Sequence, residues 1–432
     1  MGYNTHHIRT VDQIVPTAYR DDVECFADTR RLLAETFRYE PNRIPQISEF
    51  VAQLIEEGIL FIVLRHGNFP TVEHLVRAFE AEGVPCFGLY LFSDAPSHIP
   101  FRTTLHSQGS LWVLAEVVAR AASIPIYLQA HARFSFLSQV IHQVHPGAKI
   151  YQEVYDWMDH FVDPEHESVF VSEGVFTKTD IRRMRISERY ILEHVNGVIH
   201  KDAGLIEKKL AGRPSAQIFP SPPRALMRAP KSRSLPSKIR LVHAGQLRSH
   251  KAPRRVFGDL HCASLYRRLI TQNLSILLYP AFTKDKQVFR EHYGDYEELA
   301  HALEDIILRS RIPLPELIST LQDEADFGIL LYEFPTDLAA GQAHFQGTIA
   351  SKLFTYWAAG LPVLVSEELE TMASLVRDTG AGLVLKASEL GQLGNRLRKL
   401  DYEALQDAVR RAQHLYAVEN FLPKITALMR SD

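Results

Sequence analysis

The feature that most constrains the fold of this chain is a strand–turn–helix order that occurs twice. Residues 59–64 form an apolar run as long as a buried strand, residues 71–82 have helical periodicity, and residues 84–92 read as the next strand. The pattern starts again at residues 238–245, an apolar run that ends in a glycine turn. Buried strands that alternate with helices are typical of parallel sheets covered on both faces. The sequence therefore predicts an α/β chain with two Rossmann-like doubly wound domains that face a cleft.

The stretch between the two patterns is rich in proline and basic residues, as interdomain connections are. We therefore expect five segments along the chain. These are a helical extension over 1–57, a first domain over 58–220, a linker over 221–237, a second domain over 238–401, and a C-terminal helical segment over 402–432 that can pack back on the first domain.

Charge and cysteine content narrow the classes of partner. The net charge of −3 over 432 residues provides no basic field that would attract nucleic acid. Cys25, Cys86 and Cys262 are an odd, sparse set without metal-ligand spacing, which favours a reducing compartment over a disulfide framework. No apolar run approaches the ~18 residues of a membrane span. We expect a cytoplasmic protein without a transmembrane segment, and contact with a membrane surface stays open.

A short stretch of the second half has the composition of an anion-binding helix start. Gly347, Thr348 and Ser351 are small, Lys352 stands beside them, and an apolar face at helical spacing predicts a helix over 348–359. Free N–H groups at the start of such a helix attract anions. An ordinary packing helix of an α/β domain would show the same apolar face.

Four elements in the second half have the order found in a known enzyme fold. They are residues 242–251, the Ala325-Asp326 entry to an apolar strand, residues 351–363 and residues 375–383. Together they resemble the GT-B glycosyltransferases, and within that fold the retaining family four, over roughly residues 58–430. The resemblance implies transfer of a hexose-type sugar from a UDP- or GDP-linked donor by a retaining, metal-independent route. The donor would be a co-substrate, and no cofactor is expected. The acceptor is an unknown glycan, lipid, protein or small molecule.

The resemblance also implies which residues of the second domain bind the donor. A metal-free site must meet the charge of the leaving diphosphate with cations, N–H groups and a helix dipole. The implied donor-binding residues in this half are Gly245, Arg248, Lys251, Thr348, Ser351, Lys352 and Thr355. The chain departs from the family at Gln246, where an arginine is usual, and at Gly347 and Thr355, where a glutamate pair is usual. Thr355 can still hydrogen-bond a ribose hydroxyl.

In the first domain, Gly67 and Asn68 form the turn after the first strand, where the family has a glycine loop that faces both the donor phosphate and the acceptor, so the resemblance implies that they bind substrate. His131 follows the strand over 126–129, so it is a candidate catalytic residue near the cleft. Tyr155 and Asp156 stand where relatives place a histidine followed by an aspartate, and they complete the candidate catalytic set. A helix N-cap would equally explain Asp156.

Two other functions fit parts of this pattern. The absent glutamates, Gln246 and Tyr155 favour a non-catalytic glycosyltransferase-like subunit or adaptor, whose pocket could be filled by residues 344–346. A sugar-nucleotide epimerase shares the fold, but it needs paired acid and base carboxylates that the sequence does not identify. Binding and turnover of UDP- or GDP-sugars would separate these readings.

Overall fold

The computed structural model describes residues 8–55, 57–64, 70–92, 99–121, 123–130, 132–201, 205–231, 234–281 and 286–430. The candidate residues Gly67, Asn68 and His131 lie outside this described part. The chain forms two compact units. Unit 1 comprises Met1–Asp159, Gly174–Ile218 and Phe421–Asp432, and unit 2 comprises His160–Glu173 and Phe219–Asn420. The chain thus passes between the units after Asp159, Glu173, Ile218 and Asn420. No helix in the described ranges is long and apolar enough to cross a membrane.

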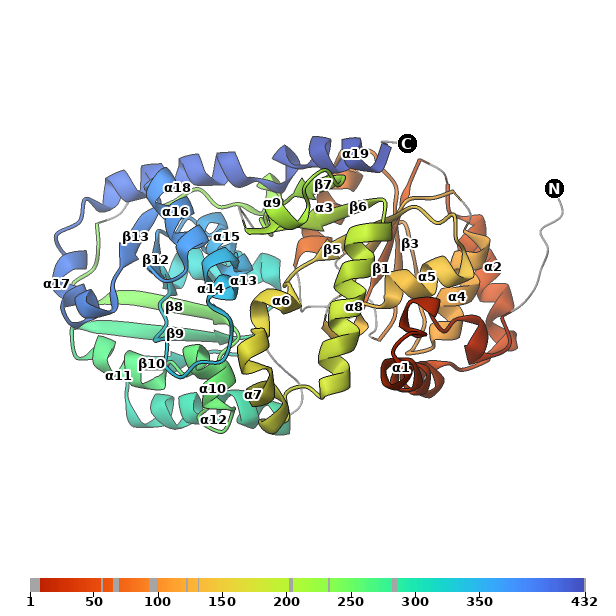
Figure 1. Cartoon of the computed structure of the whole chain (residues 1–432). Coiled ribbons are helices and arrows are strands. Elements are labelled where there is room, and N and C mark those ends of the chain that lie inside the picture. The colour runs from red at the N-terminus through yellow and green to blue at the C-terminus, as the bar shows by residue number, and fades with distance from the viewer. Residues whose placement is uncertain are drawn as a thin grey trace. The chain divides into compact units, whose positions relative to one another are not determined.

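Unit 1 is built on a parallel sheet of seven strands in the order β3-β2-β1-β4-β5-β6-β7 (Figure 1). The strands are β1 (Ile59–Val63), β2 (Cys86–Tyr90), β3 (Thr103–His106), β4 (Ile126–Gln129), β5 (Ile150–Val154), β6 (Gly197–His200) and β7 (Ser215–Gln217). Every pair is parallel, and the order reverses between β1 and β4. This is the doubly wound arrangement that the sequence predicts.

Helices connect these strands and complete unit 1. They are α1 (Val23–Thr36), α2 (Ile44–Ala52), α3 (Thr71–Ala81), α4 (Leu111–Arg120), α5 (Leu137–Val144), α8 (Lys178–His194), α9 (Leu205–Lys209) and α19 (Leu422–Arg430). Helix α19 ends the described chain, yet it contacts α3, β6 and β7. Gly197 on β6 allows this contact, because a Cβ there would lie 2.9 Å from the side chain of Leu428. The last helix therefore belongs to the fold of unit 1.

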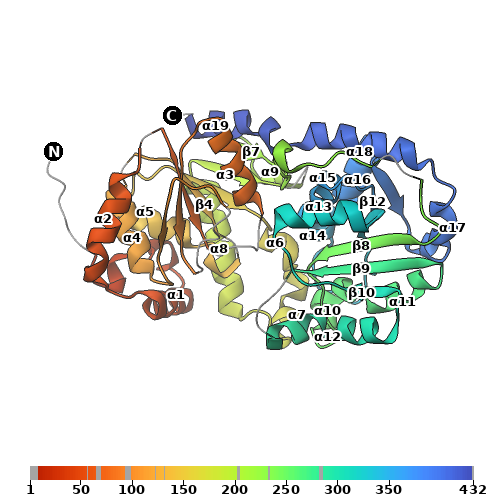
Figure 2. The ribbon, with the colours of Figure 1, turned by 180° about the vertical axis from the view of Figure 1, so that it is seen from behind.

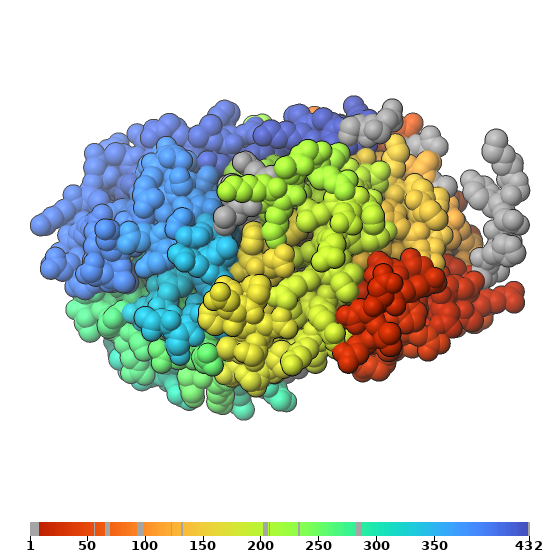
Figure 3. Space-filling view, in the orientation of Figure 1, coloured from red at the N-terminus to blue at the C-terminus, as the bar shows by residue number. Residues whose placement is uncertain are grey.

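The N-terminal residues, expected as a separate extension, pack into the core of unit 1. Ile14, Tyr19 and Leu33 are buried in the same apolar cluster as the strands. The indole of Trp112 on α4 donates to the carbonyl oxygen of Ile8 at 2.6 Å. In Figure 3 this N-terminal segment, in red, lies against the yellow-green α8, which agrees with the contacts between α1 and α8. Residues 8–55 are thus an integral layer of the unit.

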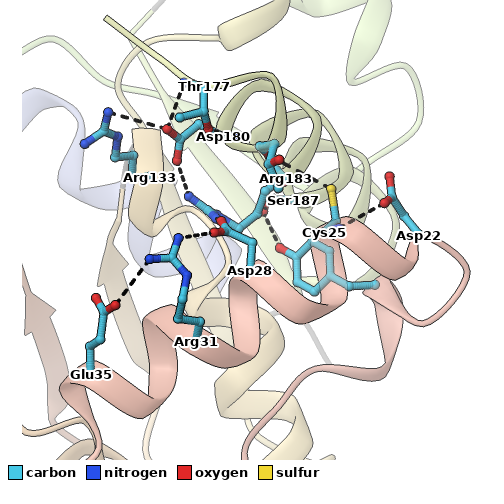
Figure 4. Close-up of polar contacts among 12 residues, drawn as sticks. Asp22, Cys25, Asp28, Arg31, Glu35, Arg133, Thr177, Asp180, Arg183 and Ser187 are labelled. Atoms are coloured by element: carbon cyan, nitrogen blue, oxygen red, sulfur yellow. Dashed lines mark hydrogen bonds and ion pairs between the residues drawn. The ribbon is translucent and has the colours of Figure 1, made fainter. Parts of the chain in front are cut away.

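A network of ion pairs around the buried side chain of Arg183 connects α1 to α8 (Figure 4). The Arg183 side chain is 3% exposed and pairs with Asp28 of α1 and Asp180 of α8. Arg133 adds a second cation 3.4 Å from Asp180. Tyr19 Oη and Ser187 Oγ are hydrogen-bonded at 2.7 Å beside this network. Since a buried charge is stable only when it is paired, these contacts fix α1 in one position on α8.

Unit 2 has a second parallel sheet of six strands in the order β10-β9-β8-β11-β12-β13; Figure 2 shows β8, β9 and β10 side by side. The strands are β8 (Ile239–Gly245), β9 (Leu274–Pro280), β10 (Ile306–Leu308), β11 (Phe327–Leu330), β12 (Val363–Ser366) and β13 (Gly382–Leu385). All pairs are parallel, and the order reverses between β8 and β11. The sequence analysis predicts β8 from the apolar run over 238–245 and β11 from the apolar strand after Ala325-Asp326.

Short and long helices surround this second sheet. They are α7 (Glu167–Ser172), α10 (Arg254–Phe257), α11 (Ala263–Ile270), α12 (Lys286–Ala302), α13 (Leu314–Glu324), α14 (Gln342–Gly347), α15 (Ser351–Ala358), α16 (Glu370–Thr379), α17 (Leu393–Leu397) and α18 (Tyr402–Tyr416). Helix α6 (Met158–Phe161) spans the first passage between the units. The carboxyl ends of β8 and β11, where the strand order reverses, are the expected ligand-binding edge of unit 2.

Candidate functional site

A lysine lies at this edge of unit 2 among neutral polar groups. Lys352, the second residue of α15, donates from Nζ to Tyr332 Oη at 2.7 Å. The same nitrogen lies 3.2 Å from Nε2 of His243 on β8. Gly245 ends β8 with φ 135°, and a Cβ there would come within 2.9 Å of Lys352 Cδ. Only glycine therefore fits where the strand passes the lysine, and the structure brings the predicted residues Gly245 and Lys352 together.

Desolvation sets the charges of this Lys352 cluster, by which we mean Lys352, His243, Tyr332 and Asp259. Burial lowers the pKa of Lys352 to about 8 and raises the pKa of Asp259 to about 7. Burial, assisted by the charge of Lys352, holds the pKa of His243 well below its usual range. At neutral pH the ammonium group is therefore charged, while its direct hydrogen-bonding partners are neutral.

Arg248 is held in a defined position in the loop after β8. Its Nη1 lies 2.7 and 2.9 Å from the two ring nitrogens of His292 on α12. The guanidinium carbon lies 4.7 Å from the centre of the Phe257 ring. When the Gln246 amide turns its oxygen toward the guanidinium, that oxygen accepts from Arg248 Nη2 at 2.7 Å. Gln246, the departure from the family arginine, is thus a support for Arg248.

Asp259 links the two cations electrostatically. The positive charges of Lys352 and of Arg248 both lower the pKa of this carboxyl group against the larger effect of burial. Both cations therefore act on one carboxylate of unit 2. Lys251, in the same loop, has an exposed side chain, and its N–H donates to Ser249 Oγ at 3.3 Å. Within the described contacts its ammonium group does not join the Lys352 cluster.

The helix that carries Lys352 starts later than the sequence predicts. Gly347 is the last residue of α14, and Thr348 follows as its C-cap, with its N–H donating to His344 O at 2.9 Å. The chain then stays extended through Ala350, so α15 begins at Ser351 instead of residue 348. The prediction was wrong because small residues before an apolar face look the same whether they begin one helix or separate two. No side chain caps α15 at Ala350, so its first N–H groups lack a side-chain acceptor.

Thr355 and residues 344–346 already have partners within unit 2. The buried Thr355 hydroxyl donates to Ser351 O at 3.1 Å, one turn earlier in α15. The His344 and Phe345 rings each lie 5.0 Å from a phenylalanine ring, of Phe161 and Phe334 respectively. Gln346 Nε2 donates to Glu370 Oε1 at 2.7 Å. The three side chains considered as a plug are thus packed against other parts of the unit.

Unit 1 has its own charged cluster at the carboxyl edge of its sheet, the Lys201 cluster of Lys201, Asp156 and Tyr155. Lys201 follows β6 and has a side chain that is 5% exposed. Its Nζ lies 3.1 Å from Asp156 Oδ1 and 3.5 Å from the centre of the Tyr155 ring. The predicted pair Tyr155 and Asp156 is thus gathered around one buried cation. Asp156 was also considered as a helix N-cap. In the structure the carboxylate of Glu188 accepts from the N–H groups of Met158 and Asp159 at the start of α6.

The sequence analysis did not identify several residues of these two clusters or their surroundings. Those missed are His243, Tyr332, Asp259, Lys201 and Glu153, a buried carboxyl group on β5 whose pKa is raised by burial and which accepts from Gln129 at 3.3 Å. A usable signal exists for some of them. His243 interrupts an apolar strand. Lys201 directly follows β6 and Tyr332 lies two residues after β11, so each stands at the carboxyl edge of its own sheet. Asp259 has no such local mark.

Comparisons with known proteins agree with this geometry. Residues 281–427 match the model of the Glucosyltransferase 3-like, C-terminal domain. HepE of Anabaena, solved in complex with UDP and glucose, is similar at 14% identity with a TM-score of 0.59, over 87% of this chain and 100% of that chain. A glycosyltransferase from Rickettsia africae is similar at 9% identity with a TM-score of 0.55, over 87% of this chain and 99% of that chain. A search among curated proteins found no match.

The two structural likenesses show the fold, and the family match shows what residues 281–427 are similar to. Both solved structures are covered almost completely, so the likeness extends over both sheets of this chain. The matched family segment includes Tyr332 and Lys352 of the Lys352 cluster. The chain is therefore a glycosyltransferase of the GT-B fold, and its residues 281–427 are similar to the Glucosyltransferase 3-like C-terminal domain.

Proposed function

We propose that the chain transfers a hexose from a nucleotide-diphosphate sugar, with the diphosphate bound by unit 2. The observation that carries this proposal is the Lys352 cluster at the point where the strand order of unit 2 reverses. Ligands of doubly wound sheets bind at that point. The similar HepE structure, which holds UDP and glucose, supports a UDP-linked donor.

The geometry suits stabilisation of a leaving diphosphate. Of the three donors on Lys352 Nζ, one is directed to Tyr332 and one lies toward His243, which leaves a third for a phosphate oxygen. The uncapped first turn of α15 adds N–H groups and the positive end of the helix dipole. Arg248 supplies a second cation. These groups can neutralise the developing charge, so we assign the reaction to a metal-independent route.

The proposal extends to the stereochemistry, the acceptor and the location. The resemblance to family four supports a transfer with retention of configuration. Asp156 and Tyr155, positioned by Lys201, are the proposed acceptor-side residues of unit 1, for a glycan, lipid, protein or small-molecule acceptor. A cytoplasmic location accords with three free, buried cysteines.

Calorimetric titration with UDP-glucose and GDP-glucose tests the proposal. We expect one of them to bind the full chain and to lose its affinity in Lys352→Ala. Lys399→Ala is the matched control, since it removes an exposed lysine of the same unit. Sugar transfer to a panel of acceptors would complete the test. Absence of binding to either donor would reject the enzyme and leave the non-catalytic subunit.

A further inference from the structure

The segment that carries Asp259 lies between two loops at the ligand-binding edge of unit 2. Asp259 is the middle residue of a short 3₁₀ helix, Gly258–Leu260. The carbonyl oxygen of Leu260 accepts from the N–H group of Arg248, in the loop after β8, at 3.1 Å. A Cβ on Gly258 would lie 2.7 Å from Cγ of Pro335, in the loop after β11. Asp259 is therefore held beside the two strands at which the order of the sheet reverses.

The carboxyl group of Asp259 has no side-chain partner among the residues that the structure describes. It accepts from the N–H groups of Asp259 itself and of Leu260. Burial raises its pKa, and the charges of Lys352 and Arg248 offset this effect in part, so both cations are near it. Neither cation forms an ion pair with it. Since a carboxylate has about four lone-pair sites, acceptor capacity remains for a ligand.

A comparison with unit 1 argues against a role as internal counter-ion. Asp156 in unit 1 approaches its cation directly, with Lys201 Nζ 3.1 Å from the carboxylate. Asp259 has two cations nearby and contacts neither, while Lys352 is bonded to the hydroxyl of Tyr332 instead. Asp259 is also partly exposed, so a ligand at this edge can reach it.

The chemistry of a carboxylate selects the part of a donor that Asp259 can bind. A carboxylate accepts hydrogen bonds and repels a phosphate group. In the proposed function the diphosphate is bound by Lys352 and Arg248. The neighbouring groups of the donor that can donate a hydrogen bond are the hydroxyls of the ribose on one side and of the hexose on the other. Hydrogen bonds from hydroxyls to an ionised carboxylate are stronger than those between neutral groups.

We propose that Asp259 binds a pair of neighbouring sugar hydroxyls of the nucleotide-sugar donor and is a specificity-determining residue of this site. The proposal rests on the proposed function, because it takes the diphosphate to be bound by Lys352 and Arg248. Asp259 makes and breaks no bond in the transfer. Its contact orients the donor and disfavours donors that lack the hydroxyl pair.

Calorimetric titration of the full chain with UDP and with UDP-glucose tests this role. Asp259→Asn keeps the shape of the side chain and removes its charge, so the dissociation constant of UDP-glucose should rise about tenfold. If the hydroxyls belong to the ribose, UDP binding weakens by the same factor. If they belong to the hexose, the affinity for UDP stays unchanged. Asp378→Asn, at an exposed position of α16, is the matched control that should bind both ligands normally.

Donor analogues separate a ligand contact from a purely structural role. Analogues of UDP-glucose that each lack one hydroxyl of the ribose or the glucose are titrated into the wild type and Asp259→Asn. Loss of a contacting hydroxyl should weaken binding about tenfold in the wild type and less than about twofold in the variant. A residue that only supports the fold would weaken every analogue by the same factor. Asp259→Ser keeps an oxygen for the N–H group of Leu260, so it serves if Asp259→Asn does not fold.

The role of Asp259 is overturned if the folded variant binds UDP-glucose within twofold of the wild type. It is also overturned if loss of each hydroxyl weakens binding equally in the variant and the wild type. Lys352→Ala separates this result from the proposed function. Donor binding that requires Lys352 but not Asp259 would remove the specificity role and leave the transferase. A wild type that binds neither UDP-glucose nor GDP-glucose would reject the proposed function itself; if only GDP-glucose binds, the GDP series replaces the UDP series.

Discussion

Two lysines stand at the carboxyl edges of the two sheets, and their surroundings differ. Lys201 in unit 1 lies 3.1 Å from a carboxylate and over an aromatic ring, so its charge is matched within the protein. Lys352 in unit 2 is bonded to a tyrosine hydroxyl and lies beside a neutral histidine, and burial lowers its pKa to about 8. A cation whose direct partners are neutral is prepared to bind an external anion. From this comparison we propose that Lys352 binds the ligand, while Lys201 positions other side chains.

The largest expected effect follows from removing Lys352. Lys352→Ala should weaken UDP-glucose binding by about 1.5–3 kcal/mol, or roughly 10- to 140-fold, because a charge-assisted contact to the diphosphate is lost. Isothermal titration measures the change against Lys399→Ala. An affinity within twofold of the wild type would show that the diphosphate does not contact the Lys352 cluster.

The pH dependence of donor binding is a second test of whether Lys352 contacts the diphosphate. Only the protonated lysine attracts the diphosphate, and bound anion raises the pKa of Lys352 above its free value of about 8. Affinity should therefore be highest below pH 8 and fall by up to about tenfold per pH unit above it. UDP-glucose suits this titration because its diphosphate has no ionisable proton in the range. The profile should flatten in Lys352→Ala; a profile that persists there would assign the titration to another group.

Substitutions of Lys201 test whether this lysine positions Asp156 and Tyr155. Lys201→Met keeps the length of the side chain but releases Asp156 and Tyr155, so turnover should fall about tenfold while the KM for the donor stays unchanged. Lys201→Arg should restore part of the rate. Combining Lys201→Met with Asp156→Asn should cost little more than either change, since the two residues act as a pair. A rise in donor KM equal to the loss in turnover would contradict a positioning role.

The smallest effect is expected for Lys251. Its exposed side chain is screened by water, so Lys251→Ala should weaken UDP-glucose binding by about 0.5–1 kcal/mol. The same titration compares it with Lys352→Ala. A loss as large as that of Lys352→Ala would mean that the loop after β8 closes on the donor and carries Lys251 to the diphosphate.

The candidate site was predictable in part. Gly245, Arg248 and Lys352 stand out because glycines and cations at strand and helix ends follow from local sequence and from family resemblance. His243 and Tyr332 required the structure, since their role depends on which strands are neighbours. The helix start before Lys352 was misplaced because only tertiary packing separates α14 from α15 at Thr348.

The sequence by itself determined the alternation of buried strands and amphipathic helices, and with it two doubly wound sheets, because strand and helix periodicity are local properties. Tertiary structure decided which distant residues meet. Lys201 pairs with Asp156 across 45 positions, and Lys352 approaches His243 across 109. It also placed residues 8–55 and α19 in unit 1, although they lie at opposite ends of the chain. Such contacts depend on the burial of apolar surface between remote segments, which no short window of sequence specifies.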